Sequence, residues 1–121
     1  YIIIPMPHGD GEDCCLHLMS IISFVDTDKA VVYSKYMPVF FREYLIDKGI
    51  QLIECNDEEY DYLGTNVLAL EPGKCVTIAG NPEIIKKMED AGVEVLTYEG
   101  KELSYRGTGG PTCLTCPIYR L

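Results

Sequence analysis

Two side chains near opposite ends of the chain could together carry out nucleophilic chemistry. Cys113 ends a glycine-rich stretch at residues 107–112, and glycine lets a backbone adopt positive φ and approach a ligand closely. A cysteine placed in this way is a candidate exposed nucleophile. Because a nucleophile needs a proton partner, His17, which lies among apolar residues, is the second candidate. Only the fold can bring the two together.

Both residues also have a structural interpretation. A cysteine in an apolar strand is usually part of the core, and a histidine flanked by leucines is usually structural. His8 lies in a loop-like segment, and we assign it no role. The chemical interpretation therefore depends on Cys113 and His17 meeting at one cleft.

The pair Cys113 and Cys116 also invites a redox or zinc interpretation. A thioredoxin-like centre places its first cysteine at a helix N-terminus, whereas residues 117–119 look extended. A zinc site could recruit Cys14, Cys15 or His17, but adjacent cysteines are poor chelators and no second Cys-x-x-Cys is present. We expect neither a metal nor a cofactor.

A repeat of two similar units must position these residues. In each unit, two strands separated by a polar turn precede a helix that begins near a proline, and a glycine precedes a third strand. The first unit is expected over about residues 18–55 and the second over about residues 64–98. Proline favours the first turn of a helix and glycine the position after its end, as Pro82 and Gly92 illustrate.

The expected strands span residues 21–25, 30–33 and 50–54 in the first unit and residues 66–70, 75–79 and 93–97 in the second. Residues 1–5 and 113–119 are predicted to be strands of neighbouring units, the latter within a C-terminal segment at 107–121 that carries Cys113. Asn81 is the expected N-cap of the second helix. Cys55 and Cys75 lie in apolar runs and are predicted to be buried free thiols.

Composition limits the classes of function. The 121 residues suffice for one α/β domain over residues 1–121. A net charge of −9 argues against a nucleic-acid partner and is compatible with a cationic substrate. No apolar run approaches the length that crosses a bilayer, so we expect no membrane partner and a cytoplasmic location.

Two motifs carry a resemblance to a known superfamily. The stretch from His17 to Ser20 (His-Leu-Met-Ser) and the stretch from Gly109 to Cys113 (Gly-Gly-Pro-Thr-Cys) resemble the histidine and cysteine motifs of guanidine-modifying enzymes. These are the arginine deiminases, dimethylarginine dimethylaminohydrolases and amidinotransferases. The likeness extends over residues 66–95 and covers nearly the whole chain. It implies a pentein fold, an α/β propeller of five units, of which this chain holds about two.

The resemblance also implies a reaction. Cys113 would attack the guanidino carbon of arginine or a methylated arginine to form a thiouronium intermediate, and His17 would protonate the leaving amine and activate water, giving citrulline. The backbone of Gly109 and Gly110 would let the substrate approach. A free thiol has a pKa of about 8.5, so a nucleophilic cysteine needs a nearby cation.

The resemblance departs from the deiminase pattern at Met19, where deiminases have an aspartate, and this favours the dimethylargininase-like branch. The chain begins with Tyr1, which suggests a fragment whose partner is a missing N-terminal half, or a second copy bound through exposed strand edges. We expect little turnover from it alone. The alternatives are a non-catalytic interaction domain with the same architecture and the thiol-redox module.

Overall fold

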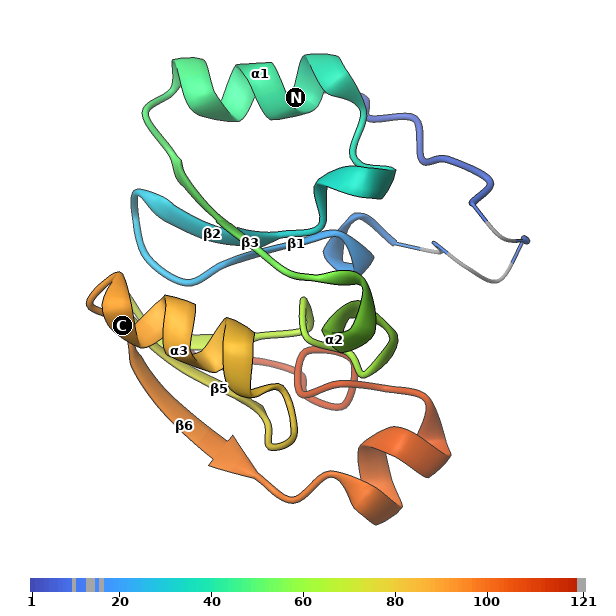
Figure 1. Cartoon of the computed structure of the whole chain (residues 1–121), viewed down its shortest axis with the longest axis vertical. Helices are drawn as coiled ribbons and strands as arrows, with labels where there is room; N and C mark the ends of the chain where they lie inside the picture. Colours follow the sequence, from blue (N-terminus) through green and yellow to red (C-terminus); the bar gives the residue numbers. More distant parts are fainter. Residues whose placement is uncertain (10, 13–14, 16, 120–121) are drawn as a thin grey trace.

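Two units of similar topology follow one another along the chain and along the long axis of the molecule (Figure 1). The computed structural model describes residues 1–9, 11–12, 15 and 17–119. The first unit contains β1 (Ile22–Phe24), β2 (Lys29–Val32), α1 (Val39–Asp47) and β3 (Gln51–Glu54). The second contains β4 (Leu68–Glu71), β5 (Lys74–Ile78), α3 (Pro82–Asp90) and β6 (Glu94–Tyr98). The predicted strand–strand–helix–strand order is confirmed in both.

Short helices precede and connect these elements. The 3-10 helices η1 (Leu18–Ser20) and η2 (Ser34–Tyr36) lie before β1 and before α1. The α-helix α2 (Asp57–Asp61) follows the first unit, and the π-helix η3 (Lys101–Tyr105) follows the second. Neither α2 nor η3 was predicted from the sequence.

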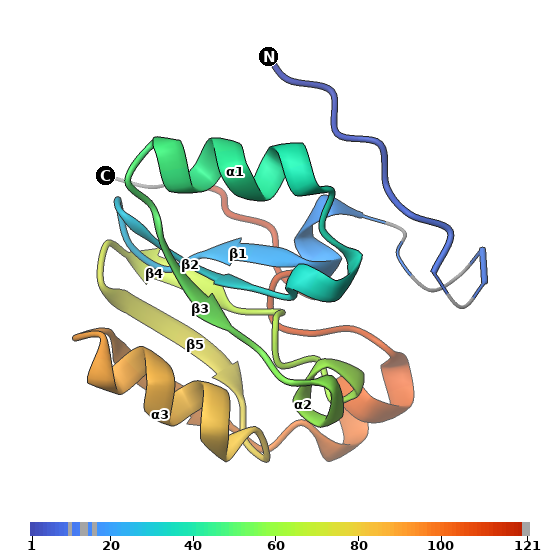
Figure 2. The ribbon, with the colours of Figure 1, turned by 45° about the horizontal axis from the view of Figure 1, so that its top comes forward.

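Each unit forms a three-stranded mixed sheet. The middle strand pairs antiparallel with the first strand and parallel with the third, so that Ala30 lies opposite Leu52 and Cys75 lies opposite Val95. Helix α1 or α3 makes the crossover between the two parallel strands, as parallel pairing requires. Figure 2 shows α1 lying over the first sheet, on the side away from the second unit.

The alternation of side chains along β2 divides the core into two clusters. Ala30 and Val32 pack with Phe41 and Leu45 of α1, whereas Val31 points to the opposite face. On that face, Val31 joins a cluster containing Ile53, Cys75, Ile84 and Met88. Helix α3 therefore packs against both sheets and fastens the units together.

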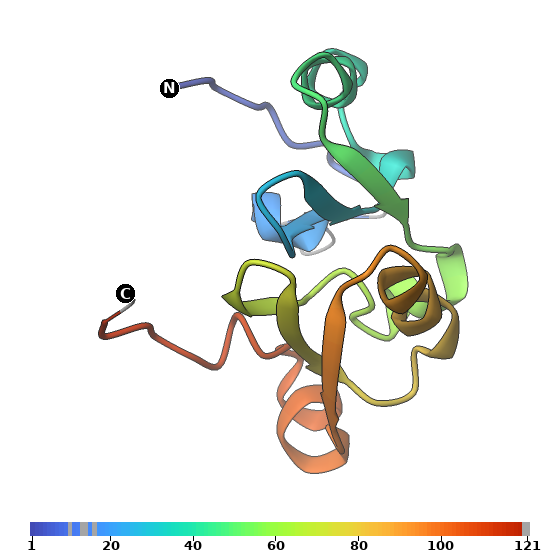
Figure 3. The same cartoon turned by 90° about the vertical axis from the view of Figure 1, so that its left-hand side faces the viewer.

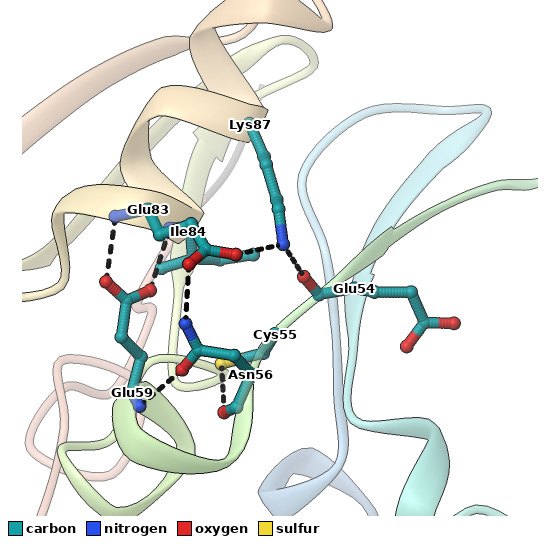
Figure 4. Close-up of polar contacts among 7 residues, drawn as sticks. All are labelled: Glu54, Cys55, Asn56, Glu59, Glu83, Ile84 and Lys87. Atoms are coloured by element: carbon teal, nitrogen blue, oxygen red, sulfur yellow. Dashed lines mark hydrogen bonds and ion pairs between the residues drawn. The ribbon is translucent and has the colours of Figure 1, made fainter.

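A buried carboxylate strengthens this connection (Figure 4). Glu59 of α2 accepts hydrogen bonds from the backbone amides of Glu83, at 2.7 Å, and Ile84, at 2.8 Å, in the first turn of α3. Asn81 occupies the predicted N-cap position, but its side chain makes no capping bond and instead donates to the carbonyl oxygen of Tyr62. The cap thus comes from a residue 25 positions before Ile84.

Two predicted strands are wrong. Residues 1–8 form no strand, and Ile4 and Met6 pack against the α1 cluster instead. Residues 113–119 form no strand either, because the amide of Leu114 donates to the carbonyl oxygen of Gly110 and closes a turn. Figure 3 shows the segment after η3 running on the side opposite α3. Both segments are apolar enough for a strand, but among the described residues no strand pairs with either of them.

The predictions for the helix faces are partly confirmed and those for two thiols are confirmed. Of the apolar residues at helical spacing in the first helix, Phe41 and Leu45 are buried but Phe40 and Tyr44 are exposed, whereas α3 buries Ile84 and Met88. Cys55 and Cys75 are buried free thiols. Among the described residues, no helix is long and apolar enough to cross a membrane.

Candidate active site around Cys113

Cys113 lies on the surface, and one side-chain amide holds its sulfur. The thiol is exposed, and Asn66 Nδ2 donates to Cys113 Sγ at 3.0 Å. The other end of the same amide, Asn66 Oδ1, accepts the backbone N–H of Thr112 at 3.0 Å. The turn before Cys113 is therefore anchored to a residue 47 positions earlier in the chain.

The glycines before Cys113 permit this close packing. A Cβ on Gly110 would lie only 2.6 Å from Asn66 Cβ, and closer still to the amide group. A Cβ on Gly109 would lie 3.4 Å from Cys113 Cβ. Both glycines are buried, so the close approach that Gly110 permits in this structure is to Asn66.

The loops that carry Asn66 and Cys113 are built alike. Each contains a residue other than glycine with positive φ, Leu63 at 61° and Thr108 at 52°. In each, the glycine that follows donates its amide back to the preceding helix, Gly64 to the carbonyl oxygen of Glu59 and Gly109 to that of Ser104. The repeat therefore continues past β6 into the segment of Cys113.

His17 is exposed and stands at the N-cap position of η1. Its carbonyl oxygen accepts the amide of Ser20 at 2.8 Å, which closes the 3-10 turn. The leucines that flank His17 in the sequence are typical of a structural histidine. Its exposure instead leaves the residue accessible for proton exchange with a substrate or water.

A hydrogen-bond network joins the His17 turn to the loop of Asn66. Thr65 Oγ1 donates to the carbonyl oxygen of Ser20 at 2.8 Å, and Ser23 Oγ donates to the carbonyl oxygen of Thr65 at 2.6 Å. Ser23 Oγ in turn accepts the amide of Val67 at 3.3 Å. Residues 65–67 thus contact the segment of His17 on one side and that of Cys113 on the other.

The two segments also line one pocket. This apolar pocket of about 310 Å³ is bounded by Leu18 and Met19, directly after His17, and by Thr112, directly before Cys113, together with Phe41 and Val67 among others. Thr112 Oγ1 is buried and has no hydrogen-bond partner among the described residues. The fold therefore brings the sequence neighbours of the two predicted catalytic residues to the lining of the same pocket.

Asn66 is the site residue that sequence reasoning missed. The sequence placed it at the start of a strand, and the structure places it in the loop just before β4. An asparagine after glycine and threonine is common in turns, so its type and spacing gave no sign of a distant sulfur. Gly110 was the one sequence signal, because a glycine can indicate a close backbone contact, but it does not identify the residue on the other side of that contact.

The remaining candidates gain less support. Cys116 is exposed, and no metal site of three or more His, Cys, Asp or Glu side chains occurs among the residues that the structure describes. Cys14, proposed for the zinc alternative, lies outside the described residues.

The buried thiols differ chemically from Cys113. Burial raises the pKa of the Cys55 thiol to about 12 and that of the Cys75 thiol to about 11. Both therefore stay protonated at neutral pH, and a protonated thiol is a poor nucleophile. Of these cysteines, the exposed Cys113 is the one suited to chemistry.

The chain matches the model of one known protein family over most of its length. The family model described as arginine deiminase matches residues 35–120, which is more than half of the chain. The chain belongs to the arginine deiminase family. It is 31% identical to an arginine deiminase of Mycobacterium avium over 134 aligned positions, covering 87% of this chain and 33% of that protein. An arginine deiminase of Rhodococcus erythropolis is 42% identical over 76 positions, covering 63% of this chain and 18% of that protein.

Solved structures share the fold. An amidinotransferase of Microseira wollei from saxitoxin biosynthesis superposes with a TM-score of 0.74 at 18% identity, covering 88% of this chain and 34% of that one. A dimethylarginine dimethylaminohydrolase of Pseudomonas aeruginosa superposes with a TM-score of 0.64 at 21% identity, covering 82% of this chain and 35% of that one. The chain is thus a mixed α/β portion of a pentein fold, as the motifs implied.

These matches bear on two expectations from the sequence. The chain spans about a third of the length of the M. avium relative that it matches. Met19 favoured the dimethylargininase-like branch, whereas the family model and the similar curated proteins are arginine deiminases. The residue at position 19 therefore does not by itself assign the branch.

Proposed function

We propose that this chain supplies the nucleophile and the acid–base group of a hydrolase that acts on the guanidino group of arginine or a methylated arginine. The observation that carries this proposal is the exposed Cys113 sulfur, held by Asn66 on a turn that shares a pocket with the residues after His17. Membership of the arginine deiminase family supports this substrate class. The P. aeruginosa relative was solved as a cysteine-to-serine variant in complex with citrulline.

The proposed reaction uses one thiolate and one imidazole. Cys113 Sγ attacks the guanidino carbon, and a C–S bond forms to give a tetrahedral adduct. The C–N bond to the leaving group then breaks while His17 gives that nitrogen a proton. His17 next takes a proton from water, which attacks the thiouronium carbon. The C–S bond breaks, the thiolate is restored, and citrulline and ammonia or an amine are released.

Labelling by a cationic reagent tests the nucleophile directly. 2-Chloroacetamidine presents an amidinium to the site, and chloroacetamide is its neutral counterpart. We expect the amidine to label Cys113 faster than the amide does, with the same comparison at Cys116 showing a smaller preference, when the modified peptides are quantified by mass spectrometry. Cys113→Ser should remove the selective label, whereas Cys116→Ser, the matched control, should retain it.

The result also separates the alternatives. Equal amidine preference at Cys113 and Cys116 would contradict a guanidinium-directed site and favour the non-catalytic domain. A thiol-redox module would instead make Cys116→Ser as damaging as Cys113→Ser in a disulfide-reduction assay. The deciding quantity is the amidine-to-amide rate ratio at each cysteine.

A further inference from the structure

The orientation of the Asn66 amide is fixed by its surroundings. The backbone N–H of Thr112 can only donate, so the atom that faces it at 3.0 Å must be the carbonyl oxygen of Asn66. The amide nitrogen then necessarily faces Cys113 Sγ, also at 3.0 Å. The hydrogen bond to sulfur is therefore a donation from Asn66 to Cys113.

Asn66 is also held firmly in place. The residue is only 7% exposed, and its backbone amide donates to the carbonyl oxygen of Leu63 at 2.9 Å. Gly110 packs against the amide group with no room for a Cβ. A donor that is fixed before the reaction begins requires no reorganisation when charge develops on its acceptor.

We propose that Asn66 is a positioning residue of the site, whose side-chain amide holds the Cys113 sulfur in its reactive orientation and favours the thiolate over the thiol. This inference rests on the proposed role of Cys113 as the nucleophile. A hydrogen bond donated to the charged form of a group stabilises that form relative to the neutral one. The loop that carries Asn66 also contacts the His17 turn, because the adjacent Thr65 bonds to Ser20.

Asn66→Asp tests the hydrogen bond donated to the sulfur separately from the one accepted from Thr112. The variant keeps an oxygen that can accept the Thr112 N–H, but it replaces the donor at sulfur by a negatively charged acceptor. The thiolate would then face a carboxylate, which disfavours its charge. Asn66→Ala removes both hydrogen bonds and tests the site without adding charge.

The measurement is the alkylation rate of Cys113 by iodoacetamide between pH 6 and 10, with Cys116 in the same chain as the internal reference. Pseudo-first-order rates are taken from the modified peptides. We expect Asn66→Asp to move the Cys113 profile to higher pH and to slow its alkylation at pH 7 by about three- to tenfold, since a loss of thiolate is partly offset by greater nucleophilicity. The Cys116 profile should stay unchanged, and Asn66→Ala should shift the Cys113 profile less than Asn66→Asp.

Folding is checked by circular dichroism, and the Ala variant provides the test if the Asp variant does not fold. An unchanged Cys113 profile in a folded variant would overturn the inference, as would an equal shift at both cysteines, which indicates a general structural effect. The amidine-to-amide ratio in the wild-type chain reports separately on the proposed function. A profile shift without amidine selectivity would retain Asn66 as a thiolate-positioning residue and remove the guanidino substrate.

Discussion

Gly110 lies directly against the side chain of Asn66, at a distance that excludes a Cβ. This contact lets the turn before Cys113 approach closely enough for Thr112 and Cys113 to bond the Asn66 amide. The residue type at position 110 therefore influences the position of the sulfur indirectly. Gly110 packs against Asn66, and Asn66 donates a hydrogen bond to Cys113 Sγ.

Gly110→Ala is expected to displace the Cys113 turn. Its methyl group would overlap Asn66, so either the loop moves or the asparagine rotates, at a cost of about 1–3 kcal/mol in unfolding free energy. Urea denaturation should show a lower unfolding free energy, and the alkylation rate of Cys113 at pH 7 should also be lower.

Gly107→Ala is the matched control for this prediction. A Cβ on Gly107 meets nothing within 4 Å. We expect this variant to change the unfolding free energy by no more than about 0.5 kcal/mol and to leave the alkylation rate unaltered. Equal effects of the two substitutions would contradict the contact with Asn66 as the cause.

Glu59→Gln is expected to weaken the connection between the units. The carboxylate accepts two backbone amides of α3, and an amide side chain would turn a donor toward one of them. Loss of a charge-assisted bond and one unsatisfied N–H should cost about 1–3 kcal/mol. Thermal and urea unfolding measure the change.

The neighbouring Glu58 serves as the control, because it is exposed on the same helix. Glu58→Gln removes the same charge without touching α3, and its effect should be below about 0.5 kcal/mol. A comparable loss in both variants would show that net charge, and not the cap, explains the result.

The sequence predicted the local elements better than their connections. Helices α1 and α3 follow from periodicity, with Pro82 at the first helical position, and both helices were confirmed, although Phe40 and Tyr44 on the predicted apolar face of α1 are exposed. The cap of α3 could not be predicted, because Glu59 lies in a different element and only the fold brings it to Ile84. Asn81 looked like the cap because local spacing is all that a sequence shows.

The same limit applies to the candidate site. Cys113 and His17 were found through residue type and motif, and their exposure agrees with a chemical role. The apolar character of residues 113–119 suggested a strand, but strand formation depends on a neighbour with free backbone groups. Asn66 escaped notice because its partner lies 47 positions away.

Of the five thiols that the structure describes, those at positions 55, 75, 113 and 116 should fall into two classes of reactivity. Cys113 and Cys116 are exposed, whereas Cys55 and Cys75 are buried with raised pKa values of about 12 and about 11. Iodoacetamide at pH 8 should modify the exposed pair in the native chain and the buried pair only after urea is added. Modification of Cys75 at the rate of Cys116 without urea would contradict its burial in the core.

The raised pKa of the buried Cys75 thiol also predicts how the unfolding free energy depends on pH. The pKa of Cys75 is raised from 9.0 to about 11 in the folded chain, so between these values the folded state keeps a proton that the unfolded state has lost. The stabilisation is fully present below pH 9 and is lost as pH rises toward 11. One such proton corresponds to about 1.4 kcal/mol of unfolding free energy per pH unit.

Cys75→Ala should therefore flatten the decline of stability between pH 9 and 11. The variant loses packing against Met88, so its unfolding free energy will be lower at every pH, and the informative quantity is the slope and not the absolute value. Urea denaturation at half-unit pH steps, with a reductant present, gives both slopes. Burial raises the pKa of Tyr105 as well, and this group contributes equally to both chains, so the difference between them isolates the thiol. Parallel slopes would mean that Cys75 ionises as readily in the folded chain as in the unfolded one.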